Sequence, residues 1–205
     1  MRRTRVKAEP ASFDRIREAL ARPGDGSSDF DLNGGAFDTP TKTLRPAGVL
    51  VPLIARDGML NVILTKRTSH LKHHPGQIAF PGGKVEPTDA DVTAAALRES
   101  QEEIGLPPEL VEVVGYLPPH ETVSVFSMTP VVARVTRDFD KVPEPGEVED
   151  VFEVPLAHLL DPENYRVQGR RWMGSTRYYF VVPYGPYYIW GATARICRVL
   201  ADRLA

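Results

Sequence analysis

The sequence contains a single cysteine and no long uninterrupted apolar segment. Cys197 has no second cysteine with which to form an internal disulfide, which suits a reducing compartment. Its apolar surroundings near the C-terminus indicate a small buried side chain rather than a nucleophile. No apolar run is long enough to span a bilayer, and no apolar signal region follows the basic N-terminus. The sequence therefore predicts a cytoplasmic protein without a membrane partner.

An excess of either charge is also lacking. The 25 Lys and Arg residues and 27 Asp and Glu residues leave a formal net charge of -2. This balance gives no reason to expect nucleic acid as a generic partner, so any anion must be recognised by local groups. The five histidines show no paired spacing of the kind that metal sites use.

The length and composition are those of an ordinary globular protein. With 205 residues, 42% hydrophobic and 25% charged, the chain suffices for one well-buried core but not comfortably for two full domains. Residues 1–46 are predicted to form a short helix, capped by Ser12, followed by an irregular arm rich in Gly, Asp, Ser, Thr and Pro. Residues 47–205 are predicted to form the main domain.

The main domain alternates strand and helix patterns. An Asp57-Gly58 turn between two apolar runs predicts an antiparallel hairpin. Predicted strands cover 48–55, 60–66, 110–117, 128–135, 151–154 and 177–183, and predicted helices include 155–160 and 189–204. The pattern predicts an α/β fold with a mixed β-sheet sandwiched between α-helices. The exposed edges of such a sheet allow a homodimer without requiring one.

A glycine turn at Gly82-Gly83 leads into a further helix. Thr88 or Asp89 is the expected N-cap, and Gly105 is the expected left-handed residue at the C-terminal end. The alanine run between them favours helix strongly.

Three glutamates lie on one face of this helix. Glu99, Glu102 and Glu103 stand at positions i, i+3 and i+4, and such close like charges call for a positive partner. A hard divalent cation with oxygen ligands suits the cluster. A solvated acidic face is the alternative, and it is the commoner reason for a glutamate-rich helix.

The residues around the three glutamates resemble the Nudix box. The resemblance rests on the double glycine, on Arg98 directly before Glu99, and on Gly105 after the acid pair. The sequence departs from the box where Asp89 replaces the first glutamate, where eight rather than seven residues separate it from Arg98, and where Ser100 replaces an aliphatic residue. The resemblance implies a Nudix hydrolase domain over residues 47–205.

It also implies a role for each residue of the box. Glu99 and Glu103 would bind Mg²⁺ or Mn²⁺, and Glu102 would be a third ligand or the group that takes a proton from water. Arg98 would support this catalytic machinery through hydrogen bonds to neighbouring carbonyls or carboxylates. A further acid from a later loop often joins such a site, and Glu147 is the first candidate. The competing loop acids are Glu121, Glu144 and Glu149.

The segment 63–83, which precedes the box, resembles the signature of the coenzyme A pyrophosphatase branch of the family. Ile63, Thr68 and Lys72 replace the usual Leu, Ser and Arg. The segments 147–153 and 188–193 are similar to that branch as well. The implied substrate is the small molecule coenzyme A or a derivative, cleaved at its diphosphate.

Substrate-binding candidates follow from this second motif. They are Lys66, Arg67, Lys72, Gly82 and Gly83. The three cations would neutralise the phosphates of coenzyme A, although basic residues on a strand and loop are as often simply solvated. Two other functions stay open: pyrophosphate cleavage in another nucleoside diphosphate derivative such as ADP-ribose or a dinucleotide, and non-catalytic nucleotide binding.

Overall fold

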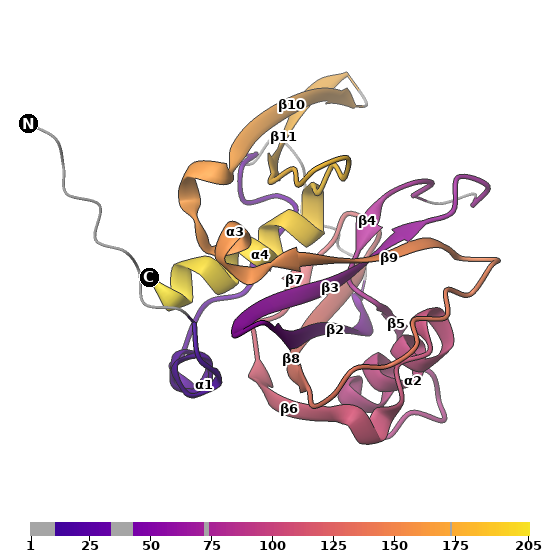
Figure 1. Cartoon of the computed structure of the whole chain (residues 1–205). Helices are drawn as coiled ribbons and strands as arrows, with labels where there is room; N and C mark the ends of the chain where they lie inside the picture. Colours follow the sequence, from indigo (N-terminus) through magenta and orange to yellow (C-terminus); the bar gives the residue numbers. More distant parts are fainter. Residues whose placement is uncertain (1–10, 34–42, 72–73, 173) are drawn as a thin grey trace, which may run out of the picture.

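The structure is a computed structural model that describes residues 11–33, 43–71, 74–172 and 174–205. Within these ranges a mixed sheet of nine strands forms the centre and a two-stranded hairpin stands beside it (Figure 1).

The strands of the main sheet are β1 (Ser27–Ser28), β2 (Arg45–Arg56), β3 (Met59–Arg67), β4 (Ile78–Ala79), β5 (Gly82–Lys84), β6 (Val111–Tyr116), β7 (His120–Glu121), β8 (Phe126–Val135) and β9 (Val148–Pro155). The hairpin consists of β10 (Arg166–Trp172) and β11 (Ser175–Val181). The helices are α1 (Phe13–Ala21), α2 (Val92–Ile104), α3 (Leu156–Leu160) and α4 (Gly191–Leu204), with short 3₁₀ turns at Pro108–Leu110 and Pro162–Asn164.

Strand β2 organises the sheet. It pairs with β3 and β5 in antiparallel fashion and with β8 in parallel fashion. Eight consecutive residues of β2 are buried because both faces of the strand are covered. The turn to β3 holds Asp57 at φ 50° and Gly58 at φ 78°, the left-handed pair that a two-residue hairpin needs. The predicted hairpin is confirmed.

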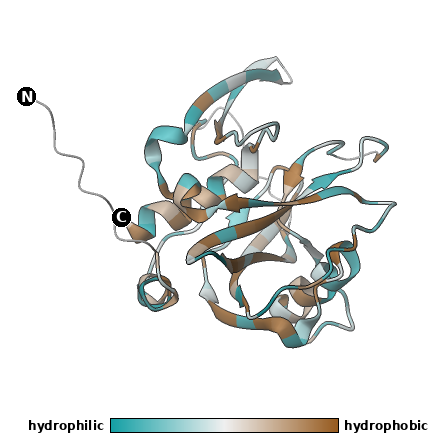
Figure 2. Ribbon diagram, in the orientation of Figure 1, coloured by the Kyte–Doolittle hydropathy of each residue, from teal (hydrophilic) through white to brown (hydrophobic). Residues whose placement is uncertain are grey.

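Two apolar clusters fill the two faces of the sheet. Helix α2 covers one face, where Ala96 and Ile104 pack with Leu50 and Ile63. Helices α1, α3 and α4 cover the other face, around a larger cluster that includes Ile196 (Figure 1). Figure 2 shows hydrophobic residues gathered on the central strands between these helices. The predicted α/β fold with a sheet between helices is confirmed.

Some predicted elements differ in length or number from those in the structure. Strand β9 begins at Val148 rather than 151, and β10 was not predicted, because Arg166–Trp172 carries three charged residues and a glycine. The predicted glycine turn contains a short strand, β5, since Gly82–Lys84 pairs with the start of β2. Cys197 is buried, as expected. No helix in the described ranges has both the length and the apolar character needed to cross a membrane.

The described part of the N-terminal segment packs onto the rest of the protein. Helix α1 is capped by Ser12, as predicted, and lies against β6 and α4. Strand β1 pairs with β7, and there Ser27 Oγ lies 2.9 Å from His120 Nδ1. Asp29 lies 3.5 Å from the other ring nitrogen. Because Ser27 and His120 are buried, this Ser, His and Asp set joins two segments and is closed to a substrate. The domain boundary at residues 46 and 47 stays a prediction.

Candidate active site

Helix α2 carries the acidic face, and its two ends are defined by specific caps. Gly105 adopts φ 70° and its N–H donates to the Gln101 carbonyl, so the predicted C-terminal end is confirmed. The predicted N-cap is wrong, because Asp91 caps the helix by accepting from the Ala94 N–H at 2.8 Å. Asp89 is engaged elsewhere, as described below.

The double glycine brings the backbone against the carboxylates of α2. The Gly82 N–H donates to Glu103 Oε2 at 3.1 Å. A Cβ added at Gly83 would lie 2.4 Å from Glu99 Oε1, so any larger residue there would displace the Glu99 carboxylate. Gly82 has φ 147°, and a Cβ there would lie 2.4 Å from the Gly48 carbonyl oxygen of β2. Gly82 is therefore required for the close approach of β5 to β2, and Gly83 leaves room for the carboxylate of Glu99. Their contact with a substrate stays a prediction.

Glu103 is an acid in an unfavourable position for charge. The residue is only 5% exposed, and burial raises the pKa of its carboxyl to about 7, against an ordinary 4.5. The Gly82 N–H and Arg67 act in the opposite direction, while the charges of Glu99 and Glu147 raise the pKa. The Gly82 N–H and Arg67 stabilise the negative charge of this carboxylate, but they do not offset the effects of burial and of the neighbouring acids.

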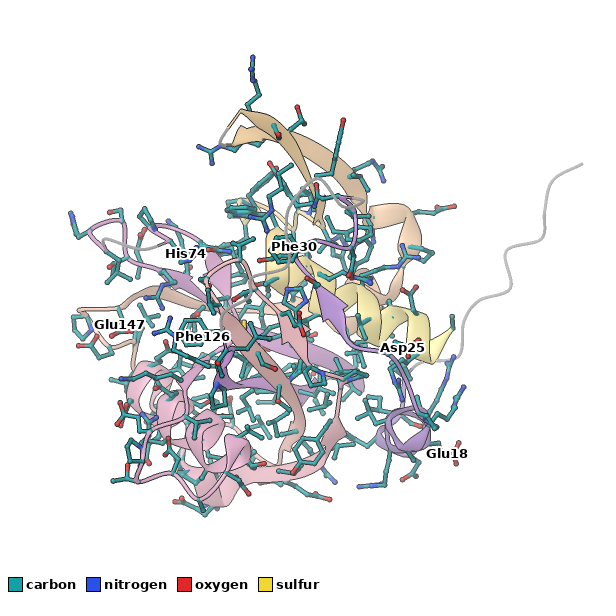
Figure 3. The ribbon with its side chains drawn as sticks, turned by 180° about the vertical axis from the view of Figure 1, so that it is seen from behind. Glu18, Asp25, Phe30, His74, Phe126 and Glu147 are labelled. Atoms are coloured by element: carbon teal, nitrogen blue, oxygen red, sulfur yellow. The ribbon has the colours of Figure 1, made fainter. Side chains whose placement is uncertain are left out.

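Glu99 shows the same pattern more weakly. Burial raises the pKa of its carboxyl, Arg98 lowers it, and the negative charges of Glu102 and Glu147 raise it. Glu147, from the loop before β9, therefore belongs electrostatically to the same group as Glu99 and Glu103. Figure 3, which views the molecule from behind, labels Glu147 on the side of the molecule where α2 lies.

Arg98 holds the acidic residues in position. Its guanidinium binds both carboxylate oxygens of Asp89 at 3.0 Å, one from Nε and one from Nη2. Its Nη1 donates to Glu99 at 3.0 Å and to Glu102 at 3.2 Å, and its Nη2 donates to the Lys84 carbonyl. These contacts agree with the anchoring role that the sequence implied. Asp89, whose pKa is lowered chiefly by its hydrogen bonds to Arg98, is the partner that fixes the guanidinium.

The two basic residues at the end of β3 have different environments. Arg67 lies 3.8 Å from Glu103 Oε1 and 3.9 Å from Glu147 Oε2, so it is a counter-charge inside the acidic group. Lys66 instead pairs with Glu149 at 2.6 Å. Lys72, the third predicted cation, lies outside the described residues.

Comparison with known proteins identifies the family. The family model for the NUDIX domain matches residues 44–173, more than half of the chain. The chain belongs to the Nudix family. It is 45% identical over 157 residues to an uncharacterized Nudix hydrolase NudL of Enterobacter sp. strain 638, covering 77% of this chain and 81% of that protein. It is 41% identical over 174 residues to the NudL of Escherichia coli O1:K1, covering 85% and 90%.

Solved structures share the Nudix fold. The NUDIX domain of Shewanella oneidensis NrtR, solved with ADP ribose, gives a TM-score of 0.50 at 16% identity, covering 86% of this chain and 97% of that chain. A MutT/nudix family protein from Enterococcus faecalis gives 0.51 at 15% identity, covering 94% and 74%. The chain is thus a Nudix enzyme of the pyrophosphohydrolase class, and Nudix hydrolases generally use divalent metal ions.

The carboxylates of this Nudix site fit a divalent cation by their chemistry. Glu99, Glu103 and Glu147 offer only oxygen donors, which Mg²⁺ and Mn²⁺ prefer. The charges of Glu99 and Glu147 raise the pKa of Glu103, and the charge of Glu147 raises the pKa of Glu99, as expected for a group that lacks positive charge. Among the described residues, no three acidic, histidine or cysteine side chains are already gathered as a metal site. The arginines Arg67 and Arg98 supply the counter-charge in this arrangement.

Two features of the Nudix site were not found by sequence reasoning. The partnership of Asp89 with Arg98 has a sequence signal, because the altered spacing places an acid nine positions before the arginine. The Glu144 N–H donates to the Glu103 carbonyl at 3.0 Å and so ties the loop of Glu147 to the end of α2. A backbone contact between residues 41 positions apart leaves no pattern in a single sequence.

Proposed function

We propose that the chain hydrolyses the diphosphate of coenzyme A and its thioesters, giving 3′,5′-ADP and 4′-phosphopantetheine or its acylated form. The position of the segment 63–83 supports this proposal. The segment runs through β3, β4 and β5, and it delivers Arg67, Gly82 and Gly83 to the carboxylates of α2. The stretch that resembles the coenzyme A branch is thus part of the acidic site itself.

Glu99 and Glu103 are the proposed ligands of Mg²⁺ or Mn²⁺, with Glu102 or Glu147 as an additional ligand. A bound divalent cation would supply positive charge to the diphosphate oxygens and would make water more acidic. Glu103 is held by the Gly82 N–H and Glu99 by Arg98, so each carboxylate already has a defined position. Such preorganisation is what makes a charged site effective.

The remaining residues orient the water and the substrate. A water oxygen attacks phosphorus in line, the bond from phosphorus to the bridging oxygen breaks, and the departing phosphate takes that oxygen with its electron pair. The proton of the water passes to a carboxylate, for which Glu147 is proposed. Glu102 is the less suitable acceptor because its carboxylate is already engaged by Arg98 at 3.2 Å. Arg67 neutralises phosphate charge beside the acids.

The decisive test is incubation with coenzyme A and Mg²⁺, followed by mass identification of both products. The proposal predicts 3′,5′-ADP and 4′-phosphopantetheine in equal amounts. ADP-ribose and dinucleoside polyphosphates serve as competing substrates. Faster cleavage of either one, with coenzyme A left intact, would contradict the proposed substrate, and saturable nucleotide binding without any cleavage would contradict catalysis.

The phosphate-binding role of Arg67 has a separate test. Coenzyme A and its 3′-dephospho form are compared as substrates for Arg67→Ala and for the control Arg134→Ala, whose guanidinium pairs with Glu112 on β6. We expect Arg67→Ala to lower kcat/KM for both substrates, because its guanidinium lies among the acids that act on the diphosphate. Unchanged turnover of both would leave Arg67 without a role in the reaction.

A further inference from the structure

A concave site separate from the acidic group lies at the same C-terminal end of β3. The pocket has a volume of about 520 Å³, and its walls come from β3, β4, the start of β9 and the segment that enters α4. This volume lies within the range of pockets that take small ligands. The acidic group and the pocket are linked through consecutive residues, because Arg67 contacts Glu103 whereas Lys66 lines the pocket.

The wall contributed by the segment before α4 is aromatic. Tyr187, Tyr188 and Trp190 all line the pocket, and Tyr188 is 43% exposed. A large ring left this exposed is a typical feature of a binding surface, because stacking of a planar ligand on the ring is favourable.

These rings are held in fixed orientations by neighbouring elements. Tyr187 stacks on Phe152 with 3.5 Å between ring centroids and 3° between planes, and its hydroxyl donates to Asp150 at 2.7 Å. The Tyr188 hydroxyl donates to Gln168 on β10, the hairpin that stands beside the start of α4 in Figure 1. The Trp190 ring packs against the ring of Tyr179 on β11, with 5.1 Å between the ring centroids. Fixed rings lose little conformational entropy when a ligand binds.

The polar groups of the pocket suit a base that carries an amino group. The carboxylates of Glu149 and Asp150 are hydrogen-bond acceptors at the rim, and Lys66 is held against Glu149. A flexible aliphatic chain neither stacks on aromatic rings nor donates hydrogen bonds to carboxylates. A planar base with an exocyclic amine does both.

We propose that this pocket binds the nucleobase of the substrate, an adenine, by stacking on Tyr188 and Trp190. The inference rests on the proposed function, because it places the diphosphate at the acidic group and the base across the end of β3. Lys66 and Arg67 are consecutive residues, so the pocket and the acidic group adjoin the same end of β3. The phosphopantetheine part of the substrate then extends from the diphosphate away from the pocket.

The fluorescence of Trp190 reports binding directly. The chain has two tryptophans, so Trp172→Phe leaves Trp190 as the only reporter. Titration of this variant with AMP, which has no diphosphate to cleave, is independent of turnover. We expect saturable quenching, a loss of AMP affinity of about tenfold to a hundredfold with Tyr188→Ala, and affinity close to wild type with Tyr188→Phe, which keeps the ring.

Tyr178→Ala is the matched control, because Tyr178 is 45% exposed on β11 and does not line this pocket. It should bind AMP as the parent does. Absence of quenching by AMP in a protein that cleaves coenzyme A would overturn the inference and leave the proposed function intact, as would quenching by 4′-phosphopantetheine alone. AMP binding that Tyr188→Ala weakens, in a protein that does not cleave coenzyme A, would support the base pocket and contradict the proposed substrate.

Discussion

Helices α2 and α4 cover opposite faces of the same sheet and have nearly the same length, 13 and 14 residues. Their buried residues differ in kind. Helix α4 buries mainly apolar side chains, among them Ile196, Leu200 and Leu204, and no charged one. Helix α2 buries Ser100 and the acid Glu103 together with two of its three alanines and Ile104.

The arginines of the two helices differ in the same way. On α4, Arg195 pairs with Asp31 and Arg198 pairs with Asp202, one acid for each guanidinium. On α2, the single guanidinium of Arg98 forms ion pairs with three acids, Asp89, Glu99 and Glu102. Helix α4 is thus arranged for stability, whereas α2 keeps an excess of negative charge, which agrees with the proposed cation site.

The largest effect is expected from Glu103→Gln. Removal of this charge should lower kcat with Mg²⁺ by on the order of a thousandfold, since a preorganised charge next to the reacting group is lost. The melting temperature should stay equal or rise, because a neutral amide is less costly to bury. The control is Glu109→Gln, which removes an exposed charge outside the site. Full turnover by Glu103→Gln would mean that the buried acid of α2 has no part in catalysis.

The converse change on α4 is Leu200→Ala. Loss of a buried leucine should reduce the free energy of unfolding by about 2 to 5 kcal/mol, measured by urea denaturation. The kcat of the molecules that remain folded should be unchanged. A marked fall in kcat per folded molecule would break the division of roles between the two helices.

The metal-free protein should lose stability as the pH rises. The folded-state pKa of Glu103, about 7, exceeds its ordinary value of 4.5, so between these values the native state holds more protons than the unfolded state. The free energy of unfolding should therefore fall by about 3 kcal/mol from pH 4.5 to above pH 7. Denaturation in the presence of a chelator measures this slope. In Glu103→Gln this contribution should vanish, and an identical slope in both proteins would contradict the assignment.

A smaller effect is expected from Arg98→Lys. Lysine keeps the charge but cannot bind Asp89 through two parallel hydrogen bonds while also reaching Glu99, so the acids lose their fixed positions. Both kcat/KM and the affinity for Mn²⁺ should fall by about 10-fold to 100-fold. Arg195→Lys on α4 is the matched control, and it should change neither quantity. Equal effects of the two changes would remove the distinction between the helices.

The sequence predicted α4 and the C-terminal end of α2 correctly because apolar spacing and a left-handed glycine are local signals. The N-cap of α2 was predicted wrongly because Asp89 and Asp91 are chemically equivalent caps, and the choice between them depends on Arg98, which takes Asp89. Nothing in the sequence indicated that Lys66 and Arg67 have different acidic partners, and both were assigned to one phosphate site. Which acid each cation meets depends on the pairing of β3 with β9 and on the packing of α2.

Titration of the substrate-free protein with Mn²⁺, followed by calorimetry, tests most directly whether the acids of α2 bind a cation. The account predicts saturable binding that Glu99→Gln and Glu103→Gln each weaken strongly and that Glu109→Gln leaves unchanged. Equal Mn²⁺ affinity in all four proteins would contradict it.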